Sequence, residues 1–246
     1  MSLLELSNIT KSFGAIHALQ GVDLRIAPGE AVGLMGDNGA GKSTLVKIIA
    51  GNFLPTSGQV KVEDREVHFH KPLDARKAGI EVVYQDLALA DNLTAAENVF
   101  LGRELRKGWG PFATLDKQAM IERSSELFEE LKSETRPRDL VQKMSGGQRQ
   151  AVAIARTRLS DPKLVIMDEP TAAISVRQVA EVLNLIKRLK ATGHAVILIS
   201  HRMPDVFEVC DRIAVLRRGT KVADKATAET SPEEITGLIT GAIDAA

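Results

Sequence analysis

Three short apolar runs, each rich in branched side chains, occur along the chain and end in polar residues or glycine. They cover residues 30–36 (EAVGLMG), 163–169 (KLVIMDE) and 195–201 (AVILISH). Runs that are apolar at nearly every position, rather than at alternate ones, are typical of parallel strands buried on both faces. The pattern therefore predicts a parallel sheet at the centre of the fold.

Helical periodicity fills intervals between these runs. It is clearest in residues 41–51 (GKSTLVKIIAG) and in residues 175–193, which close on Gly193 as a helix C-cap would. Strands that alternate with helices favour an α/β fold, in which ligands bind at the carboxyl ends of the strands.

Other segments alternate between apolar and polar residues in the manner of half-buried antiparallel strands. They are residues 3–9, 22–26 and 58–69, with the turn residues Pro28–Gly29 and Asp64–Arg65 between them. A smaller antiparallel β subdomain is therefore expected to flank the α/β core.

Strand signals disappear in the middle of the chain, where charged helical segments such as residues 116–132 dominate. We read this part as a helical subdomain inserted into the core, all within a single domain. The expected boundaries are 1–93 and 161–246 for the α/β core with its β subdomain, and 94–160 for the helical subdomain.

Composition narrows the classes of function. The chain has 246 residues, with 32 basic and 32 acidic side chains, so no net charge favours nucleic acid as a partner. The single Cys210 excludes an internal disulfide and suits a reducing compartment. The start shows no secretory signal, and the longest apolar runs are far short of the ~20 residues of a membrane-spanning helix. A role at a membrane would need a partner that supplies the spans.

The stretch GDNGAGKST, Gly36–Thr44, has the spacing of a phosphate-binding loop between a predicted strand and a predicted helix. Its glycines let backbone N–H groups point at a phosphate, Lys42 would reach the β and γ phosphates, and Ser43 offers a hydroxyl to Mg²⁺. The alternative is a glycine-rich turn before an ordinary helix. The residues predicted to hold the nucleotide are Gly36, Asp37, Asn38, Gly39, Ala40, Gly41, Lys42, Ser43 and Thr44.

Polar side chains end three strand-like segments, residues 164–169, 195–201 and a further segment at residues 80–85 (IEVVYQ). Asp168 would help hold the metal, and Glu169 would orient or deprotonate an attacking water. His201 could hydrogen-bond a γ-phosphate, and Gln85 could ligate Mg²⁺ or position water. Each residue taken alone has an ordinary alternative, since polar residues commonly begin loops, but the accompanying phosphate loop favours the catalytic interpretation.

Another candidate site precedes the predicted helix at residues 148–160. The stretch QKMSGGQRQ, residues 142–150, places Ser145 and the pair Gly146–Gly147 at the start of that helix, where an anion could dock. The alternative is a simple turn that leads into the helix.

Together these motifs resemble the nucleotide-binding subunits of ABC transporters over essentially the whole chain. Six stretches follow in the order of the family: KSFG, GDNGAGKST, YQD, MSGGQ, LVIMDEP and ISH. The resemblance implies an ABC ATPase fold with ATP and Mg²⁺ as cofactors. It also implies that Phe13 stacks on adenine, where the family more often has tyrosine, although Phe13 could instead be a core residue. By the same resemblance Gln85 links the metal site to a membrane partner and His201 holds the γ-phosphate.

The family also implies a role for the glycine pair. In a head-to-tail dimer, this stretch caps the ATP that is held by the second subunit. The resemblance therefore implies an ATP-dependent homodimer in which the capping residues are Ser145, Gly146, Gly147 and Gln148.

Two positions depart from the family pattern. Met144 replaces a leucine, which conserves volume. Ser175 stands where many members have an aspartate that acts across the dimer, so the signal between the two sites is expected to differ.

Residues 84–104, with the stretch DEPTAAIS, resemble the branch of monosaccharide importers, in a single-domain variant. This branch implies integral membrane permease subunits as direct partners, a periplasmic sugar-binding protein as an indirect one, and a peripheral place on the cytoplasmic face of the inner membrane. An exporter subunit or an importer of another solute is the main alternative. Chromosome-organising ATPases, tandem translation factors and simple P-loop kinases or GTPases fit less well, since they need coiled coils, a second ATPase domain or an acceptor pocket.

Overall fold

The computed structural model describes residues 2–110, 113–172 and 174–243. The chain forms two compact units. The first comprises residues 1–82, 162–169 and 189–246, and the second comprises residues 83–161 and 170–188. The subdomain boundaries expected from the sequence, at 93/94 and 160/161, stay a prediction.

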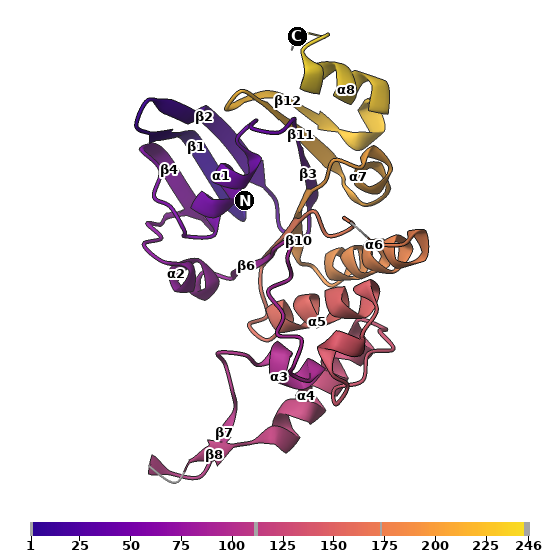
Figure 1. The fold of residues 1–246 in the computed structure, drawn as a ribbon. Coiled ribbons are helices and arrows are strands. Elements are labelled where there is room, and N and C mark those ends of the chain that lie inside the picture. Colours follow the sequence, from indigo (N-terminus) through magenta and orange to yellow (C-terminus); the bar gives the residue numbers. More distant parts are fainter. Residues whose placement is uncertain (1, 111–112, 173, 244–246) are drawn as a thin grey trace. The chain divides into compact units, whose positions relative to one another are not determined.

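The strands of the first unit form two main sheets, and Figure 1 labels most of these strands. The antiparallel sheet has the order β2 (Ile16–Ile26), β1 (Leu4–Phe13), β4 (Ser57–Val62) and β5 (Arg65–Glu66). The larger sheet has the order β12 (Thr220–Ala226), β11 (Arg212–Arg217), β3 (Ala31–Met35), β10 (Ala195–Ile199), β9 (Leu164–Asp168) and β6 (Ile80–Val83). Strands β11, β3, β10 and β9 pair in parallel, and β12 pairs antiparallel to β11. The predicted α/β class and its antiparallel flank are confirmed.

The main core lies between the antiparallel sheet and one face of the larger sheet. Strands β3 and β10 are buried at every residue, because both faces of the sheet are covered. Alternate residues of β9, Leu164 and Ile166, join this core together with Leu45 and Ile49 of the helix α1 (Lys42–Ile49). The core thus holds the phosphate loop between β3 and α1 in place.

Of the helices, the first unit contains α1, α2 (Pro72–Lys77), α7 (Met203–Val209), the short 3₁₀ turn η3 (Thr227–Glu229) and α8 (Pro232–Thr240). The second contains α3 (Ala95–Val99), α4 (Lys117–Glu130), η2 (Val141–Lys143), α5 (Gly146–Arg158) and most of α6 (Val176–Ala191). Helices α1, α4, α5 and α6 lie in segments whose periodicity predicts helix, and the other helices were not predicted. Within the described part of the chain, none of the helices has the length and apolar character that a bilayer crossing requires.

Three local predictions are corrected. The turn predicted at Asp64–Arg65 is formed by Glu63 and Asp64, which both have positive φ, so Arg65 already belongs to β5. The segment predicted to lack strands contains a short hairpin of β7 (Arg106–Lys107) and β8 (Thr114–Leu115). Helix α5 begins at Gly146 rather than at Gln148, because Ser145 caps it.

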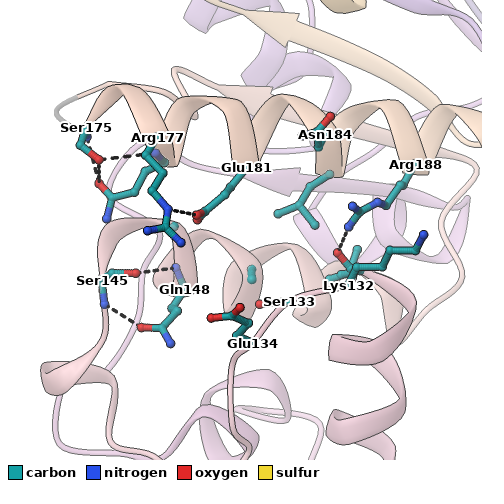
Figure 2. A pocket seen from close by; sticks show the side chains of 15 residues that line it. Lys132, Ser133, Glu134, Ser145, Gln148, Ser175, Arg177, Glu181, Asn184 and Arg188 are labelled. Atoms are coloured by element: carbon teal, nitrogen blue, oxygen red, sulfur yellow. Dashed lines mark hydrogen bonds and ion pairs between the residues drawn. The ribbon is translucent and has the colours of Figure 1, made fainter.

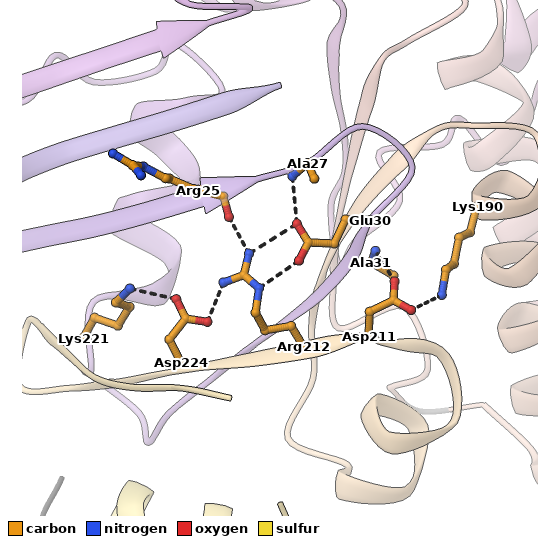
Figure 3. Close-up of polar contacts among 9 residues, drawn as sticks. All are labelled: Arg25, Ala27, Glu30, Ala31, Lys190, Asp211, Arg212, Lys221 and Asp224. Carbon is orange, nitrogen blue, oxygen red and sulfur yellow. Dashed lines mark hydrogen bonds and ion pairs between the residues drawn. The ribbon is translucent and has the colours of Figure 1, made fainter. Parts of the chain in front are cut away.

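A single guanidinium joins the two main sheets of the first unit (Figure 3). Arg212, at the start of β11, donates to both carboxylate oxygens of Glu30 at 2.8 and 3.3 Å. It also donates to Asp224 on β12 and to the carbonyl of Arg25 on β2. Burial by itself lowers the pKa of Arg212, but hydrogen bonds to Glu30 and Asp224 outweigh burial and raise this pKa above its ordinary value.

Replacing this guanidinium is expected to destabilise the protein. In Arg212→Met the carboxylates of Glu30 and Asp224, only 19% and 25% exposed, lose their main counter-charge. We expect the free energy of unfolding to fall by about 2 kcal/mol, less than for a fully buried pair because water still reaches the cluster. Urea unfolding followed by circular dichroism measures this loss.

The matched control is Arg25→Met. The Arg25 side chain is 76% exposed and pairs with Glu5, so its removal is expected to cost about 0.5 kcal/mol or less. Equal losses in the two variants would show that Arg212 has no special part in joining the sheets.

Candidate functional site

The predicted phosphate loop follows β3 and leads into α1. Gly36 has a φ of 150°, and a Cβ at this position would lie 2.2 Å from the carbonyl oxygen of Leu216, so only glycine fits. Gly39 also has a positive φ, but nothing lies within 4 Å of its would-be Cβ. One side of the loop is therefore packed tightly against β11, while its middle faces open space.

The first turn of α1 keeps its backbone amides free of side-chain caps. Its N-cap is Gly41 in the left-handed conformation, with no capping hydrogen bond from a side chain. The Lys42 ammonium donates to the carbonyls of Gly36 at 2.6 Å and Asp37 at 3.0 Å. Burial lowers the pKa of Lys42, and the nearby carboxylates, that of Glu169 foremost, act against this shift. The loop thus presents amides and one ammonium at a helix N-terminus, which favours an anion.

Strand register brings the predicted acidic residues to the same edge of the sheet as this loop. Ile199 of β10 lies opposite both Leu34 of β3 and Asp168 of β9. Because these strands are parallel, their carboxyl ends meet, and the loops that follow them are neighbours. Burial raises the pKa of Asp168, and the adjacent Glu169 carboxylate adds to that rise. Burial and Glu169 thus disfavour the charged form of Asp168, and Lys42 and Lys47 offset only part of this effect.

Glu169 and His201 face each other at this edge. The two atoms Nδ1 of His201 and Oε2 of Glu169 lie 2.7 Å apart, with the histidine side chain 70% exposed and the glutamate 15% exposed. Apart from this contact, the buried oxygen has no hydrogen-bond partner among the described residues. The backbone at Glu169 has a φ of 52°, and its N–H donates to the carbonyl of Ile199 at 2.9 Å. A buried carboxylate oxygen is thus held at the sheet edge with its accepting capacity unused.

The remaining predicted residues lie in two places. Phe13 ends β1 in the first unit and is 43% exposed. Gln85 lies exposed in the turn after β6, in the second unit. The first unit therefore brings together the phosphate loop, Asp168, Glu169 and His201, whereas Gln85 and the glycine pair belong to the second unit.

In the second unit, the glycine pair forms the first turn of α5. The Ser145 hydroxyl accepts from the Gln148 N–H at 3.3 Å, and the Gln148 side chain accepts from the Ser145 N–H at 3.0 Å, which is a complete capping box. A Cβ on Gly146 would lie 2.8 Å from Ile174, and one on Gly147 would lie 2.5 Å from a carboxylate oxygen of Glu181. Gly146 is therefore required by the close approach of Ile174, which lies just before α6, a packing reason that the sequence alone does not reveal. The Glu181 carboxylate is the movable end of a side chain, so packing does not by itself require glycine at Gly147.

Helix α6 begins with the same capping arrangement as α5. Ser175 accepts from the Gln178 N–H at 3.4 Å, and the Gln178 side chain accepts from the Ser175 N–H at 2.9 Å. Ser175 thus serves as a helix cap; Ala173, in the same stretch, lies outside the described residues. The S-x-x-Q spacing could have revealed this cap from the sequence.

The starts of α5 and α6 border a cavity of about 530 Å³ (Figure 2). Ser145, Gln148, Ser175 and Glu181 contribute to its lining. Arg177 also lines it and pairs with Glu181 at 3.4 Å. Two helix N-termini therefore lie beside one another within the second unit, with both signs of charge around them.

The residues present fit a nucleotide with its metal ion. The open phosphate loop, the uncapped α1 amides and Lys42 suit phosphate oxygens. Ser43, exposed in the first turn of α1, and Asp168, whose pKa is raised by burial, suit a divalent cation. Among the described residues, no three His, Cys, Asp or Glu side chains gather to hold a metal by themselves. A magnesium ion would thus depend on phosphate and water oxygens for most of its ligands.

The sequence of this chain is similar to those of known proteins. The profile of the family described as ABC transporter matches residues 19–172. The xylose/arabinose import ATP-binding protein XylG of Sulfolobus acidocaldarius is 46% identical over 97% of this chain and 94% of its own length. The ribose import ATP-binding protein RbsA of Yersinia pestis bv. Antiqua is 43% identical over 97% of this chain. The chain spans only 46% of the length of that ribose relative.

Solved structures show the same fold. A nucleotide-free ATP-binding cassette from an ABC transporter superposes with a TM-score of 0.81 at 28% identity, covering 98% of this chain and 96% of the other. A dimeric ATP-binding cassette in a post-hydrolysis state, bound to ADP and Pi, superposes with a TM-score of 0.75 at 29% identity, covering 91% and 98%.

Proposed function

This chain belongs to the ABC transporter family, and from that premise we propose that it is the ATP-binding and ATP-hydrolysing subunit of a monosaccharide importer. The observation that carries the proposal is the strand register that sets the phosphate loop beside Asp168 and Glu169. The sugar is proposed because relatives at 43% and 46% identity are named for ribose and for xylose/arabinose import.

The phosphate loop would hold the triphosphate of ATP. Backbone amides of Gly39 to Ser43 would donate to the α and β phosphates, and Lys42 would exchange its carbonyl partners for β and γ phosphate oxygens. Ser43 and Asp168 would hold the magnesium ion, which would neutralise charge between the phosphates. Gln85 as a further ligand stays a prediction. Phe13 would stack on the adenine ring.

Hydrolysis would depend on Glu169 and His201. The buried Oε2 of Glu169 has unused accepting capacity, so this carboxylate could take a hydrogen bond from an attacking water and orient or deprotonate it. His201, 70% exposed beside it, could turn from the glutamate to donate to the γ-phosphate. The pair would thus bind both the water and the phosphoryl group that it attacks.

The second cradle would be Ser145, Gly146, Gly147 and Gln148 at the start of α5. We propose that it caps the ATP of a second copy in a homodimer, since an N-terminal turn with this geometry favours an anion. A related cassette is dimeric with ADP and Pi bound, which supports this arrangement. Dimer closure on ATP and opening after hydrolysis would then provide the mechanical step.

The dimer would act on permease subunits at the cytoplasmic face of the inner membrane, and a periplasmic sugar-binding protein would deliver the solute to them. Copurification of a tagged chain with its permease, followed by reconstitution in proteoliposomes with the binding protein, tests this. We expect one monosaccharide of a panel to stimulate ATP hydrolysis and to accumulate inside. ATP-driven extrusion, or uptake of a solute that is not a sugar, would overturn the monosaccharide assignment.

A further inference from the structure

Two aromatic rings meet between the phosphate helix and the end of β1. Phe13 and Phe53 pack edge to face, with ring centroids 5.4 Å apart and an interplanar angle of 71°. Phe53 follows α1 and is partly buried against the main core, whereas Phe13 is 43% exposed. Phe53 is therefore the anchored ring of the pair, and Phe13 is the ring that a ligand can reach.

Two ammonium groups lie over these rings. Nζ of Lys11 is 5.2 Å from the centroid of Phe13 and 5.6 Å from that of Phe53, and Nζ of Lys47 is 5.7 Å from that of Phe53. Cations at such distances are attracted to ring faces. Even with Lys11 over its ring, Phe13 remains 43% exposed, so a planar ligand can still reach it.

Backbone hydrogen bonds hold the loop that carries Phe53 at both ends. Its own N–H donates to the carbonyl of Lys47 in α1 at 3.2 Å. The Lys11 ammonium donates to the carbonyl of Leu54 at 2.7 Å, and the N–H of Thr56 donates to the carbonyl of Thr10 on β1 at 2.8 Å. The loop thus ties the helix of the phosphate site to the strand that ends in Phe13.

We infer that Phe53 and Lys11 are positioning residues for nucleotide binding, which hold the Phe13 ring at a set distance from the phosphate loop so that base and triphosphate bind together. The inference rests on the proposed function, in which Phe13 stacks on adenine. The edge-to-face contact with Phe53 limits rotation of Phe13, and the Lys11 ammonium over the Phe13 ring adds a second restraint. Because the loop that carries Phe53 is anchored to α1, the fold itself sets the distance between the base and the triphosphate.

Binding of ATP and of inorganic tripolyphosphate, measured by calorimetry, tests this inference. In Phe53→Leu, which keeps apolar volume but removes the ring, we expect the Kd for ATP to rise about threefold to tenfold and that for tripolyphosphate to stay unchanged. Lys11→Met is expected to raise the Kd for ATP about twofold to fivefold. Phe53→Tyr, which keeps the ring, should restore binding to within about twofold of wild type. In hydrolysis assays of Phe53→Leu, KM should rise more than kcat falls.

Phe69→Leu is the matched control. Phe69 is 7% exposed in the same core but makes no ring pair with Phe13 among the described residues, so its loss should lower stability and leave both Kd values unchanged. Phe13→Ala separates the inference from the function it rests on. If Phe13→Ala weakens ATP binding and Phe53→Leu does not, positioning by Phe53 is refuted and the stacking role remains. Unchanged ATP binding in Phe13→Ala would refute both the stacking role of Phe13 and its positioning by Phe53. If Phe53→Leu weakened the binding of ATP and of tripolyphosphate equally, Phe53 would have only a structural role.

Discussion

Glu169→Gln is expected to lower the rate of ATP hydrolysis about 10²- to 10⁴-fold, the range that a positioned general base contributes. An amide of the same shape keeps the packing of this 15% exposed side chain but cannot accept a proton from water. ATP binding by the phosphate loop should persist, because none of its groups changes. The variant should therefore accumulate as an ATP-bound dimer, visible by size-exclusion chromatography with ATP and magnesium, while phosphate release measures turnover.

Glu63→Gln is a matched control for this variant. Glu63 is also a glutamate with positive φ, 50° against 52° at Glu169, but its side chain pairs with Lys163 at the surface. Its substitution should leave hydrolysis unchanged. Hydrolysis at the wild-type rate in Glu169→Gln would remove this carboxylate from the mechanism and leave the water without an assigned base.

Ser145→Arg is expected to reduce hydrolysis to background and to leave ATP binding by the monomer intact. Ser145 is exposed at the start of α5, so a long cationic side chain there would block the approach of a second copy. It would also remove the hydroxyl that caps α5, at a cost of about 1 kcal/mol. Calorimetry with ATP measures nucleotide binding by the monomer, and a phosphate-release assay measures hydrolysis.

Ser231→Arg is the matched control, because it also removes the N-cap of a helix. Ser231 caps α8 in the first unit, where its hydroxyl accepts from the Glu234 N–H at 3.2 Å. The two variants should lose similar stability, yet only Ser145→Arg should lose hydrolysis. Loss of ATP binding by monomeric Ser145→Arg would mean that the glycine pair serves the nucleotide of its own chain.

The elements predicted best are those whose signal is local. The strands β3, β9 and β10 are continuous apolar runs, and α1 follows a glycine-rich loop whose spacing already implies a phosphate. The hairpin of β7 and β8 was missed because two-residue strands carry no periodicity. The turn at Glu63–Asp64 was predicted one residue too late, at Asp64–Arg65. Two non-glycine residues adopt positive φ at this turn, against their usual preference.

The sequence by itself determined the α/β class, the phosphate loop and the acidic strand end, since each depends on neighbours along the chain. Only the tertiary structure decided which side chains meet. Register between parallel strands places Ile199 between Asp168 and Leu34, and this pairing joins residues far apart in the chain. The need for glycine at Gly146 likewise comes from Ile174, whose side chain leaves no room for a Cβ. Such contacts depend on close packing between distant segments, and no local pattern encodes that packing.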